Sequence, residues 1–239
     1  MQAIILCAGR GTRLGTITES QHKATLKIGK QSIIQRQIEF LYKLNIFDIS
    51  VITGYKSKQI ENELPSNVNF IENKFFNSTG TLYSLFCAKE LLNQETLYIH
   101  GDLIFDFELL KNLCENNQSD ILLAVDPSDS QIINTNQQNE PIKNVDADYF
   151  CYTDFNKIGL YIGMGKYSKK GSLILQKAID KFKIHNDSFE DVSEILRYIS
   201  SSNQIVYPNF VTDFDWFNVN NKDELIKARL KFGQGNIFN

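Results

Sequence analysis

The chain has 239 residues, enough to form one large α/β domain or two small ones and to bury a sizeable core. A hydrophobic content of 42%, a charged content of 22% and a net charge of −3 are ordinary for a globular protein. Because this charge supplies no overall basic field, we expect no nucleic-acid partner, and local basic residues must carry any phosphate binding.

Short apolar runs alternate with helical periodicity over the first half of the chain. Residues 1–7 form a continuous apolar run that stops at glycines, which is typical of a buried parallel strand, and residues 32–44 carry apolar side chains at helical spacing. Further strands are predicted at 47–53, 67–71, 96–100 and 120–125, and further helices at 56–64, 80–92 and 105–116. This alternation predicts right-handed βαβ units and a parallel sheet.

The alternation stops at 126–155, which is rich in Asn, Gln and Asp and which we interpret as loops and short antiparallel strands. Beyond it we predict strands at 157–163, 204–207 and 216–219, and helices at 172–182, 188–200 and 222–232. No internal repeat and no Pro/Gly/Ser linker is found. We therefore expect an α/β, Rossmann-like domain over residues 1–239, with a predominantly parallel central sheet flanked by helices. Residues 1–125 would be its nucleotide-binding half and 126–239 a smaller acceptor-binding half. A separate lid-like lobe after residue 125 is the alternative.

Cysteine usage and hydropathy limit the setting in which the protein works. Cys7, Cys87, Cys114 and Cys151 are scattered without a C-x-x-C pair, which argues against a zinc site and a disulfide framework. No apolar stretch approaches the roughly 20 residues that a membrane span needs. The N-terminus is typical of a strand entering a glycine loop, not of a signal peptide. These features predict a cytoplasmic protein with no membrane partner, and they leave the oligomeric state open.

The loop after the first strand carries Gly9, Gly11 and Arg13. Glycines let backbone amides approach phosphate oxygens, and arginine adds a planar charged fork suited to phosphate. The dinucleotide-binding fingerprint would need a glycine at Leu14, and the ATPase-type loop would need Gly-Lys-Ser/Thr, so neither is present. Lys23, ten residues after Arg13, could reach back over the same phosphates. A plain strand–turn connection with a solvated lysine is the alternative, and it leaves Arg13 without a purpose.

These residues resemble the sugar-nucleotide pyrophosphorylase superfamily of nucleotidyltransferases, most closely its small bacterial cytidylyltransferases of the CTP:phosphocholine type. The family's signature is a strand, G-x-G-T/S-R-L, P-K-x-L, and a helix with I-x-x-Q-I/L-x-x-L. The matching segments here are 9–14, 23–26 and 34–41, and the match is specific over about the first 125 residues. His22 stands where the family usually has proline, which should change loop stiffness rather than chemistry.

The resemblance implies a role for each residue of the loop. Arg13 would contact the β- and γ-phosphates of a nucleoside triphosphate, and Lys23 would neutralise the α-phosphate, so these two are the expected catalytic residues. The rest of the loop would hold the nucleotide through Leu6, Ala8, Gly9, Gly11 and Thr12.

A hydroxyl-rich segment precedes and opens the predicted helix 80–92. Short hydroxyl side chains and a glycine can contact a base edge and cap a helix at once, and a simple N-cap is the alternative. The segment resembles the T-G/N-N/T-L-x-S-L stretch of the phosphocholine branch, which implies CTP as the donor, whereas the residues alone indicate only a nucleotide. The expected contacts are Ser78, Thr79, Gly80, Thr81 and Ser84.

Asp102 directly follows the predicted strand 96–100. Ligands of open α/β sheets bind beyond the carboxyl ends of strands, and Mg²⁺ prefers oxygen ligands, so Asp102 is the predicted magnesium ligand, with a turn former as the alternative. The resemblance implies a second aspartate near the C-terminus, where this chain has Asn220. Either Asn220 ligates through its amide oxygen, or Asp213 or Asp215 substitutes, or water fills the place.

The acceptor side is predicted from acidic and aromatic residues. Glu190 and Asp191 could hold an ammonium group, or they could be helix N-terminal acids favoured by the macrodipole. Aromatic side chains could contribute a cation cage or belong to the core; they are Tyr149, Phe150, Tyr152, Tyr161 and Trp216.

The expected reaction is in-line attack of an acceptor phosphate on the α-phosphorus of CTP with release of pyrophosphate. Phosphocholine is the leading acceptor, and phosphorylated glutamine, 2-aminoethylphosphonate and sugar 1-phosphates are alternatives. Two other classes stay open. Asn220 in place of a carboxylate is also compatible with a nucleotide-binding regulatory module that has lost catalysis, and a dehydrogenase is the remaining alternative.

Overall fold

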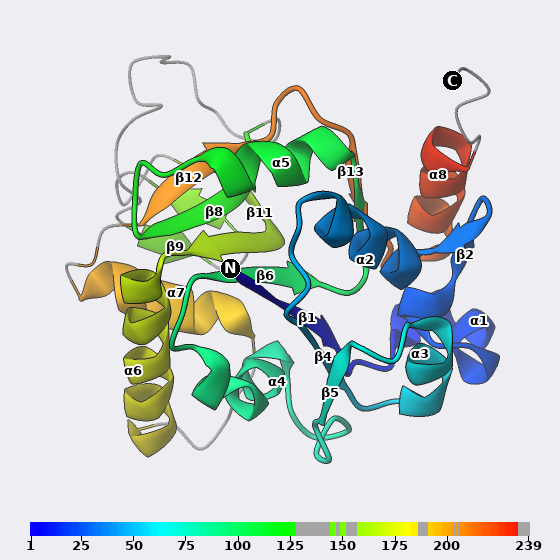
Figure 1. The fold of residues 1–239 in the computed structure, drawn as a ribbon, viewed down its shortest axis with the longest axis horizontal. Helices are drawn as coiled ribbons and strands as arrows, with labels where there is room; N and C mark the ends of the chain where they lie inside the picture. Colours follow the sequence, from blue (N-terminus) through cyan, green and yellow to red (C-terminus); the bar gives the residue numbers. More distant parts are fainter. Residues whose placement is uncertain are drawn as a thin grey trace.

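The computed structural model describes residues 1–127, 144–146, 149–151, 157–185, 191–202, 204 and 206–233, with backbone alone at 144–146, 149–151, 157–158 and 183–185. A twisted central sheet runs through the molecule (Figure 1). Its strand order is β12 (Tyr207–Phe210), β8 (Ile121–Asp126), β11 (Lys157–Tyr167), β6 (Thr96–His100), β1 (Gln2–Cys7), β4 (Ile49–Thr53) and β5 (Asn69–Glu72). Two short strands, β9 (Asn144–Asp146) and β10 (Tyr149–Cys151), extend from β11.

Parallel pairing prevails among the seven strands of the main order, as expected. β1 pairs in parallel with β4 and β6, β5 with β4, and β12 with β8. Within that order β11 lies antiparallel between β6 and β8, and beside it β10 pairs antiparallel with β11 and β9. The predicted α/β class with a mostly parallel sheet is therefore confirmed, whereas the division into two functional halves stays a prediction.

The alternation of side chains along β1 separates two hydrophobic clusters, one on each face of the sheet. Ile4 and Leu6 belong to the cluster covered by α4 (Thr81–Cys87), α6 (Lys169–His185) and α7 (Val192–Ser201). Ala3 and Ile5 belong to the cluster covered by α2 (Ile33–Lys43), α3 (Ser57–Glu63) and α5 (Phe107–Glu115). Strand residues that point alternately to two apolar layers explain the continuous apolar run at the start of the chain.

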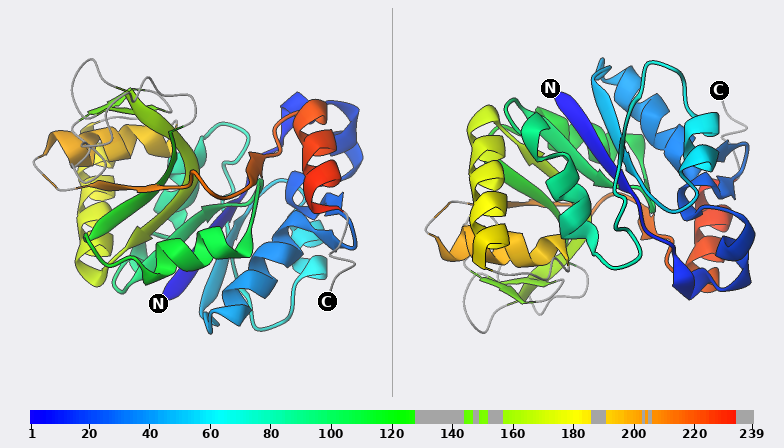
Figure 2. Two further views of the ribbon diagram at one scale, coloured as in Figure 1. Left: turned by 90° about the horizontal axis from the view of Figure 1, so that it is seen from above. Right: turned by 90° about the horizontal axis from the view of Figure 1, so that it is seen from below.

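A third cluster joins the two ends of the chain. Leu14 of the glycine loop packs in this cluster with Leu225 and Phe232 of α8 (Lys222–Phe232). Figure 2 shows α8 beside α1 (Thr16–Ser20), although some 200 residues separate them in sequence. This packing brings the C-terminal segment to the loop that follows β1.

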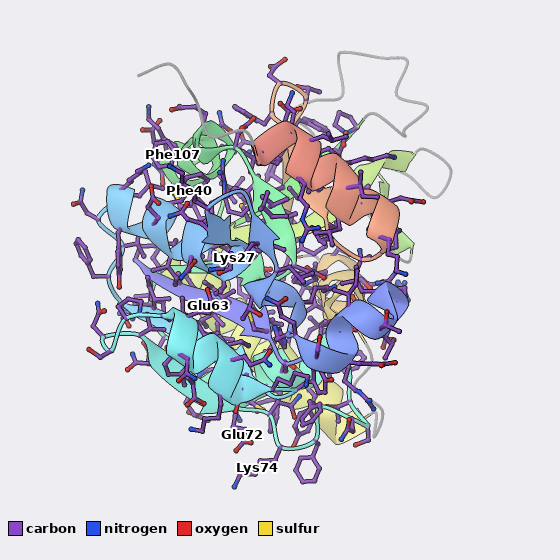
Figure 3. All side chains as sticks on the ribbon, turned by 90° about the vertical axis from the view of Figure 1, so that its right-hand side faces the viewer. Lys27, Phe40, Glu63, Glu72, Lys74 and Phe107 are labelled. Carbon is purple, nitrogen blue, oxygen red and sulfur yellow. The ribbon has the colours of Figure 1, made fainter. Side chains whose placement is uncertain are left out.

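Surface contacts tie the covering elements to one another (Figure 3). Lys27 of the hairpin β2 (Lys27–Ile28) and β3 (Gln31–Ser32) makes an ion pair with Glu63 of α3, with Nζ and Oε2 3.1 Å apart. Phe40 of α2 packs edge-on against Phe107 of α5, with ring centroids 5.4 Å apart. None of the helices in the described ranges is long and apolar enough to span a membrane.

Several element boundaries differ from the sequence expectations. β7 (Leu103–Phe105) was missed; it pairs with β13 (Trp216–Asn218), so a distant partner defines it, not a local pattern. The strand expected at 204–207 lies at β12, where register with β8 selects residues 207–210. Helix 80–92 divides into α4 and a 3₁₀ turn, Lys89–Leu91, and the strand and helix predicted at 157–163 and 172–182 extend beyond those limits in β11 and α6.

Lys166 of β11 is a buried cation away from the sheet edge that carries the glycine loop. Its Nζ donates to the carbonyls of Cys114 and Asn116 at 2.6 and 2.8 Å and to the Asn117 side chain at 2.8 Å, which satisfies the C-terminal end of α5. Its side chain is 5% exposed. Removing the ammonium leaves partly buried carbonyls without this donor and breaks the ion pair with Glu95, so we expect Lys166→Met to lower the free energy of unfolding by about 3 kcal/mol.

Urea unfolding of Lys166→Met and Lys170→Met would check this. Lys170 is the matched control, because its side chain is 75% exposed and forms a surface ion pair with Asp120. Surface pairs contribute at most about 1 kcal/mol. Equal losses for the two variants would contradict the assigned role of Lys166.

Candidate active site

Two cavities meet at the carboxyl ends of β1 and β6. The glycine-loop cavity, of about 250 Å³, is lined by Leu6, Cys7, Gly9, Gly11, Thr12, Arg13, His22, Lys23, Ala24, Thr81, His100, Gly101, Asp102 and Asn220. The wide cavity, of about 590 Å³, is lined by Arg13, Thr81, His100, Asp102, Asp126, Leu160, Tyr161, Gly163, Asp191, Trp216, Phe217, Asn218, Asn220, Glu224 and Lys227. The residues that line both are Arg13, Thr81, His100, Asp102 and Asn220. The cavities are therefore neighbours with a common wall of polar side chains.

Two glycines shape the cavity side of the glycine loop. Gly11 has a φ of +65°, a conformation that glycine adopts without strain, and the Thr18 hydroxyl donates to its carbonyl at 3.0 Å. At Gly9 a Cβ atom would meet nothing within 4 Å, so the loop leaves open space on its cavity side. That space lets an anionic group approach the backbone directly.

The predicted cations and oxygen ligands converge beside this loop from distant parts of the chain. Lys23 pairs with the Asp102 carboxylate through its Nζ, which also lies 3.1 Å from the amide oxygen of Asn220. Arg13 donates to the same Asn220 oxygen at 2.8 Å. Arg13, Lys23 and Asp102, which lie far apart in the sequence, thus line one cavity.

Asp102 remains ionised despite its burial. Its side chain is 20% exposed, and burial alone would raise the pKa of this carboxyl. The Lys23 ammonium, with a smaller contribution from His100, more than offsets burial and holds the pKa of Asp102 below its ordinary value. Its Oδ1 atom is shielded from solvent and has no hydrogen-bond partner in the described part of the chain. An anionic oxygen without a partner, next to the Asn220 amide oxygen, fits the preference of Mg²⁺ for oxygen ligands.

Buried polar contacts fix the turn that carries Asp102. Gln37 of α2 is 1% exposed and donates to the carbonyls of His100 and Leu103, at 3.0 and 2.6 Å, on either side of the turn. At Gly101 a Cβ atom would come within 2.1 Å of the Cys7 sulfur, so only glycine fits there. The position of the carboxylate is thus set by the close approach of β1 and α2.

The C-terminal segment is held to the same turn. Val219 donates its backbone N–H to the Asp102 carbonyl at 3.0 Å. Glu224 and Asn221 form the capping box of α8, and Glu224 accepts from the backbone N–H of Asn220 at 2.7 Å. These contacts direct the Asn220 amide oxygen toward Arg13 and Lys23. Asp213 and Asp215 line neither cavity, and Asp215 pairs with Lys231 at 2.6 Å.

The wide cavity combines acids with aromatic rings. Asp191 accepts from the Thr81 hydroxyl at 2.9 Å and caps α7 through Ser193. Asp126 accepts from the Trp216 indole N–H at 3.0 Å. Tyr161, Asp191 and Trp216 therefore line the same cavity, and their contact with an acceptor stays a prediction. Glu190 and Tyr152 lie outside the described residues, as do the side chains of Tyr149 and Phe150.

The predicted base-recognition segment behaves differently. Of its residues, Thr81 lines both cavities, whereas Ser78, Thr79, Gly80 and Ser84 line neither. The Thr79 hydroxyl donates to the Phe75 carbonyl at 2.8 Å, and buried Asn73 donates to Thr79 and Ser84 at 3.2 and 3.1 Å. These hydroxyls stabilise the loop before α4, and their contact with a base stays a prediction. In the glycine loop, Leu6, Gly9, Gly11 and Thr12 line the glycine-loop cavity, while Ala8 uses its carbonyl to accept from Tyr55.

Gln37, His100 and Asp126 contribute to the site, although they carry no role in the sequence interpretation. A polar glutamine among Ile34, Ile38 and Leu41 on the buried face of a helix is a signal for Gln37, because such a group must find buried partners. No local pattern singles out Asp126, which reaches the cavity only because β8 ends there.

His22, the departure from the family's proline, has a consequence for stability. It is 2% exposed, its Nδ1 accepts from the Ala24 N–H at 3.0 Å, and burial, aided by Lys23, lowers its pKa to about 4. An unfolded chain binds this proton near the ordinary pKa of 6.5. Stability is therefore lost as pH falls from 6.5 toward 4, by roughly 3 kcal/mol from this group.

Unfolding in urea between pH 7 and pH 4 would check the contribution of His22. His22→Pro is the comparison, because His22 has a φ of −68°, which proline adopts. Proline lacks the backbone N–H that donates to the Gln59 side chain, so the variant loses this hydrogen bond at every pH. Its free energy of unfolding should nevertheless fall less steeply as the pH is lowered. Parallel pH curves for the two proteins would rule out this contribution.

Comparison with known proteins identifies the family of the chain. Residues 3–145, more than half of the chain, match the MobA-like NTP transferase domain. The CTP:phosphoglutamine cytidylyltransferase of Campylobacter jejuni is 28% identical over 220 residues, which cover 87% of this chain and 82% of that protein. The bifunctional protein GlmU of Methanococcus aeolicus is 35% identical over 152 residues, or 60% of this chain, but the match spans only 35% of that longer protein.

The fold is shared with solved nucleotidyltransferases. The CTP:phosphocholine cytidylyltransferase of Streptococcus pneumoniae superposes with a TM-score of 0.71 and 23% identity, covering 96% of this chain and 98% of that one. Because the identity is low, this likeness concerns the fold. The family match rests on the segment that contains the glycine loop, Lys23 and Asp102. The chain belongs to the MobA-like NTP transferase family.

Proposed function

We propose that this protein transfers CMP from CTP to a small phosphorylated acceptor and releases pyrophosphate. The observation that carries the proposal is the convergence of Arg13, Lys23, Asp102 and Asn220 on the wall common to the two cavities. Family membership supports a nucleotidyltransferase, and the cytidylyltransferases among its relatives support CTP as the donor. The glycine-loop cavity would take the triphosphate and the wide cavity the acceptor.

Placing the triphosphate and the acceptor in these two cavities supports an in-line transfer reaction. An oxygen of the acceptor phosphate forms a bond to the α-phosphorus, and the bond from that phosphorus to the bridging oxygen of the β-phosphate breaks. The electron pair leaves with pyrophosphate. Because the acceptor phosphate is already ionised at neutral pH, no general base is needed. Lys23 would neutralise the α-phosphate and Arg13 the β- and γ-phosphates, so positioning and charge neutralisation supply the rate enhancement.

Asp102 and Asn220 are the residues that would hold Mg²⁺. The metal would neutralise phosphate charge and orient the triphosphate when bound. The Lys23 ammonium contacts both side chains and so links the two oxygen ligands to the phosphate-binding cations. We expect Lys23 to leave Asn220 for phosphate when the nucleotide binds.

The wide cavity indicates the kind of acceptor. Carboxylates of Asp126 and Asp191 lie in one chamber with Tyr161 and Trp216, a setting that suits a positively charged amine or quaternary ammonium. Phosphocholine is the leading acceptor on these grounds, and phosphoglutamine and 2-aminoethylphosphonate also carry an amine. A sugar 1-phosphate does not use the acids in this way.

Substrate profiling tests the function. Pyrophosphate release would be measured with CTP, UTP, GTP and ATP against each of these acceptors in the presence of Mg²⁺. We expect turnover with CTP and an amine-bearing acceptor. Tight binding of CTP without pyrophosphate release for any acceptor would instead favour a regulatory module that has lost catalysis, for which Asn220 is the motivating observation.

Asn220 itself gives a prediction about the metal. We expect Asn220→Asp to tighten Mg²⁺ binding about tenfold, or ~1.4 kcal/mol, because a second carboxylate would face the ion. In EDTA the same variant should bind CTP more weakly, because the introduced carboxylate would neutralise Arg13 and Lys23. Calorimetry with Mg²⁺ and a non-hydrolysable CTP analogue measures both effects.

The matched control is Asn221→Asp. It adds the same charge one residue away, and aspartate replaces asparagine as an N-cap of α8 without loss. Equal Mg²⁺ affinities for the two aspartate variants would show that Asn220 does not face the metal.

A further inference from the structure

His100 lies at the junction of the two cavities, and its ring is fixed on three sides. It is the last residue of β6 and lines both the glycine-loop cavity and the wide cavity. Its Nε2 is 2.6 Å from the hydroxyl of Tyr98. The Tyr161 ring packs edge-on against it at 6.2 Å, and Gly163 of β11 lies against its Nδ1 edge. A polar ring held this firmly between two cavities calls for an explanation beyond packing.

The contact with Tyr98 determines which ring nitrogen carries the proton. Tyr98 is 1% exposed, and within the described residues its hydroxyl has one hydrogen-bond partner, Nε2 of His100. If Nε2 carried the proton, the buried hydroxyl proton would have no acceptor, at a cost of about 1–3 kcal/mol. The hydroxyl therefore donates to Nε2, which leaves Nδ1 as the ring nitrogen that carries a proton.

The Nδ1 edge lies beside Gly163, and both residues line the wide cavity. Gly163 has a φ of +91°, and a Cβ atom there would come within 2.7 Å of Nδ1. Because glycine has no Cβ, no side chain at position 163 covers Nδ1 from that side. No acceptor for Nδ1–H is present among the described side chains and carbonyls, so the donor is available to a bound molecule.

We propose that His100 donates Nδ1–H to a phosphate oxygen of the acceptor and thereby orients the attacking phosphate. The proposal deepens the proposed function and rests on it. Attack on the α-phosphorus must occur where the two cavities meet, and His100, Arg13 and Asn220 all line that wall. The Nδ1–H group orients a phosphate oxygen through a directional hydrogen bond, whereas Arg13 supplies charge. Tyr98 is then a positioning residue, which acts through the ring it holds.

Three variants separate these roles. His100→Leu removes the donor, and we expect the KM of the acceptor to rise about tenfold or more, while the KM of CTP stays within about twofold. His100→Asn places an amide N–H near the position of Nδ1 and should recover most of that loss. Tyr98→Phe keeps the His100 ring but removes the hydroxyl that fixes its proton on Nδ1, so the KM of the acceptor should rise by an intermediate factor. The acceptor used is the compound with the highest turnover in the profile.

A spectroscopic measurement tests the same inference without turnover. In ¹⁵N-histidine-labelled protein, His100 should show the Nδ1–H tautomer, and Tyr98→Phe should show a mixture of the two tautomers. Addition of phosphocholine with a non-hydrolysable CTP analogue should shift the Nδ1 resonance in the wild type. An Nε2–H tautomer in the wild type, or an equal rise in both KM values for His100→Leu, would overturn the proposal. If no acceptor is turned over, the proposed function fails, and an unchanged Nδ1 resonance then decides against His100 as well.

Discussion

Replacing Lys23 with alanine is expected to lower kcat by about 10²–10³-fold, because removal of one preorganised charge-stabilising group from an active site costs that much. Lys23 lies in the glycine-loop cavity, where its Nζ contacts Asp102 and Asn220, so no other ammonium takes its place beside Asp102 in the described residues. The loss should appear in kcat more than in the KM of CTP, because charge on the α-phosphate increases toward the transition state. Steady-state pyrophosphate release with CTP and the preferred acceptor measures it.

The matched control is Lys27→Ala, four residues away. Lys27 is 46% exposed at its side chain, makes a surface ion pair with Glu63, and lines neither cavity (Figure 3). Its removal should leave kcat within about twofold. Thermal unfolding of both variants separates a loss of turnover from a loss of stability. This is needed because Lys23→Ala also leaves the Asp102 carboxylate without its partner. A folded Lys23→Ala protein with full turnover would refute the role of Lys23 and the phosphate site with it.

The convergence of residues at the glycine-loop cavity could be predicted from the sequence because its signals are local. Gly9, Gly11 and Arg13 follow one strand directly, and Asp102 follows another, and parallel strands bring their carboxyl ends to one edge. Two independent local patterns thus specify one place in space. Asn220 could be predicted only through the family resemblance, since its backbone reaches Asp102 by way of the β7–β13 pairing.

The acceptor end could be predicted only in part, because its geometry depends on long-range contacts. Thr81 and Asp191 are 110 residues apart and meet only when α7 packs beside α4. Asp126 and Trp216 meet across β8 and β13, and nothing in either segment signals the other. His100 shows the same limit, because Gly163 of β11 lies beside its ring. The alternating pattern predicted a strand at 157–163 but not its antiparallel position next to β6.

The loop before α4 illustrates a different limit. Serine and threonine hydroxyls satisfy turns and caps as readily as they bind a base, so composition alone cannot separate the two uses. Here the side-chain amide of Asn73, which is fully buried, donates hydrogen bonds to the hydroxyls of Thr79 and Ser84. These two hydroxyls therefore serve contacts of the loop with Asn73 and Phe75, and neither of them caps α4.

Asp102→Asn is expected to abolish most of the Mg²⁺-dependent turnover, with a loss of about 10²-fold or more. The charge arithmetic gives the reason. Arg13, Lys23 and Asp102 leave the site with one net positive charge, and because position 220 is an asparagine, Asp102 is the only carboxylate among the described residues that contacts Lys23. A chain with two aspartates could keep a weakened metal site after losing one. This chain, left with two amides, would hold no anionic ligand for the ion.

Two measurements distinguish loss of the metal site from loss of the fold. Calorimetry should show that Mg²⁺ binding in the presence of a non-hydrolysable CTP analogue is weakened by about tenfold or more, while metal-free CTP binding is retained or tightened, because the two cations lose their anionic competitor. Asp106→Asn is the control: its side chain accepts from the Asp215 N–H at 2.9 Å, a bond that asparagine can keep, and it lines neither cavity. If the Asp102→Asn protein bound Mg²⁺ as tightly as the Asp106→Asn protein, Asp102 would be a partner of Lys23 alone, and the metal would have to be held by the nucleotide phosphates.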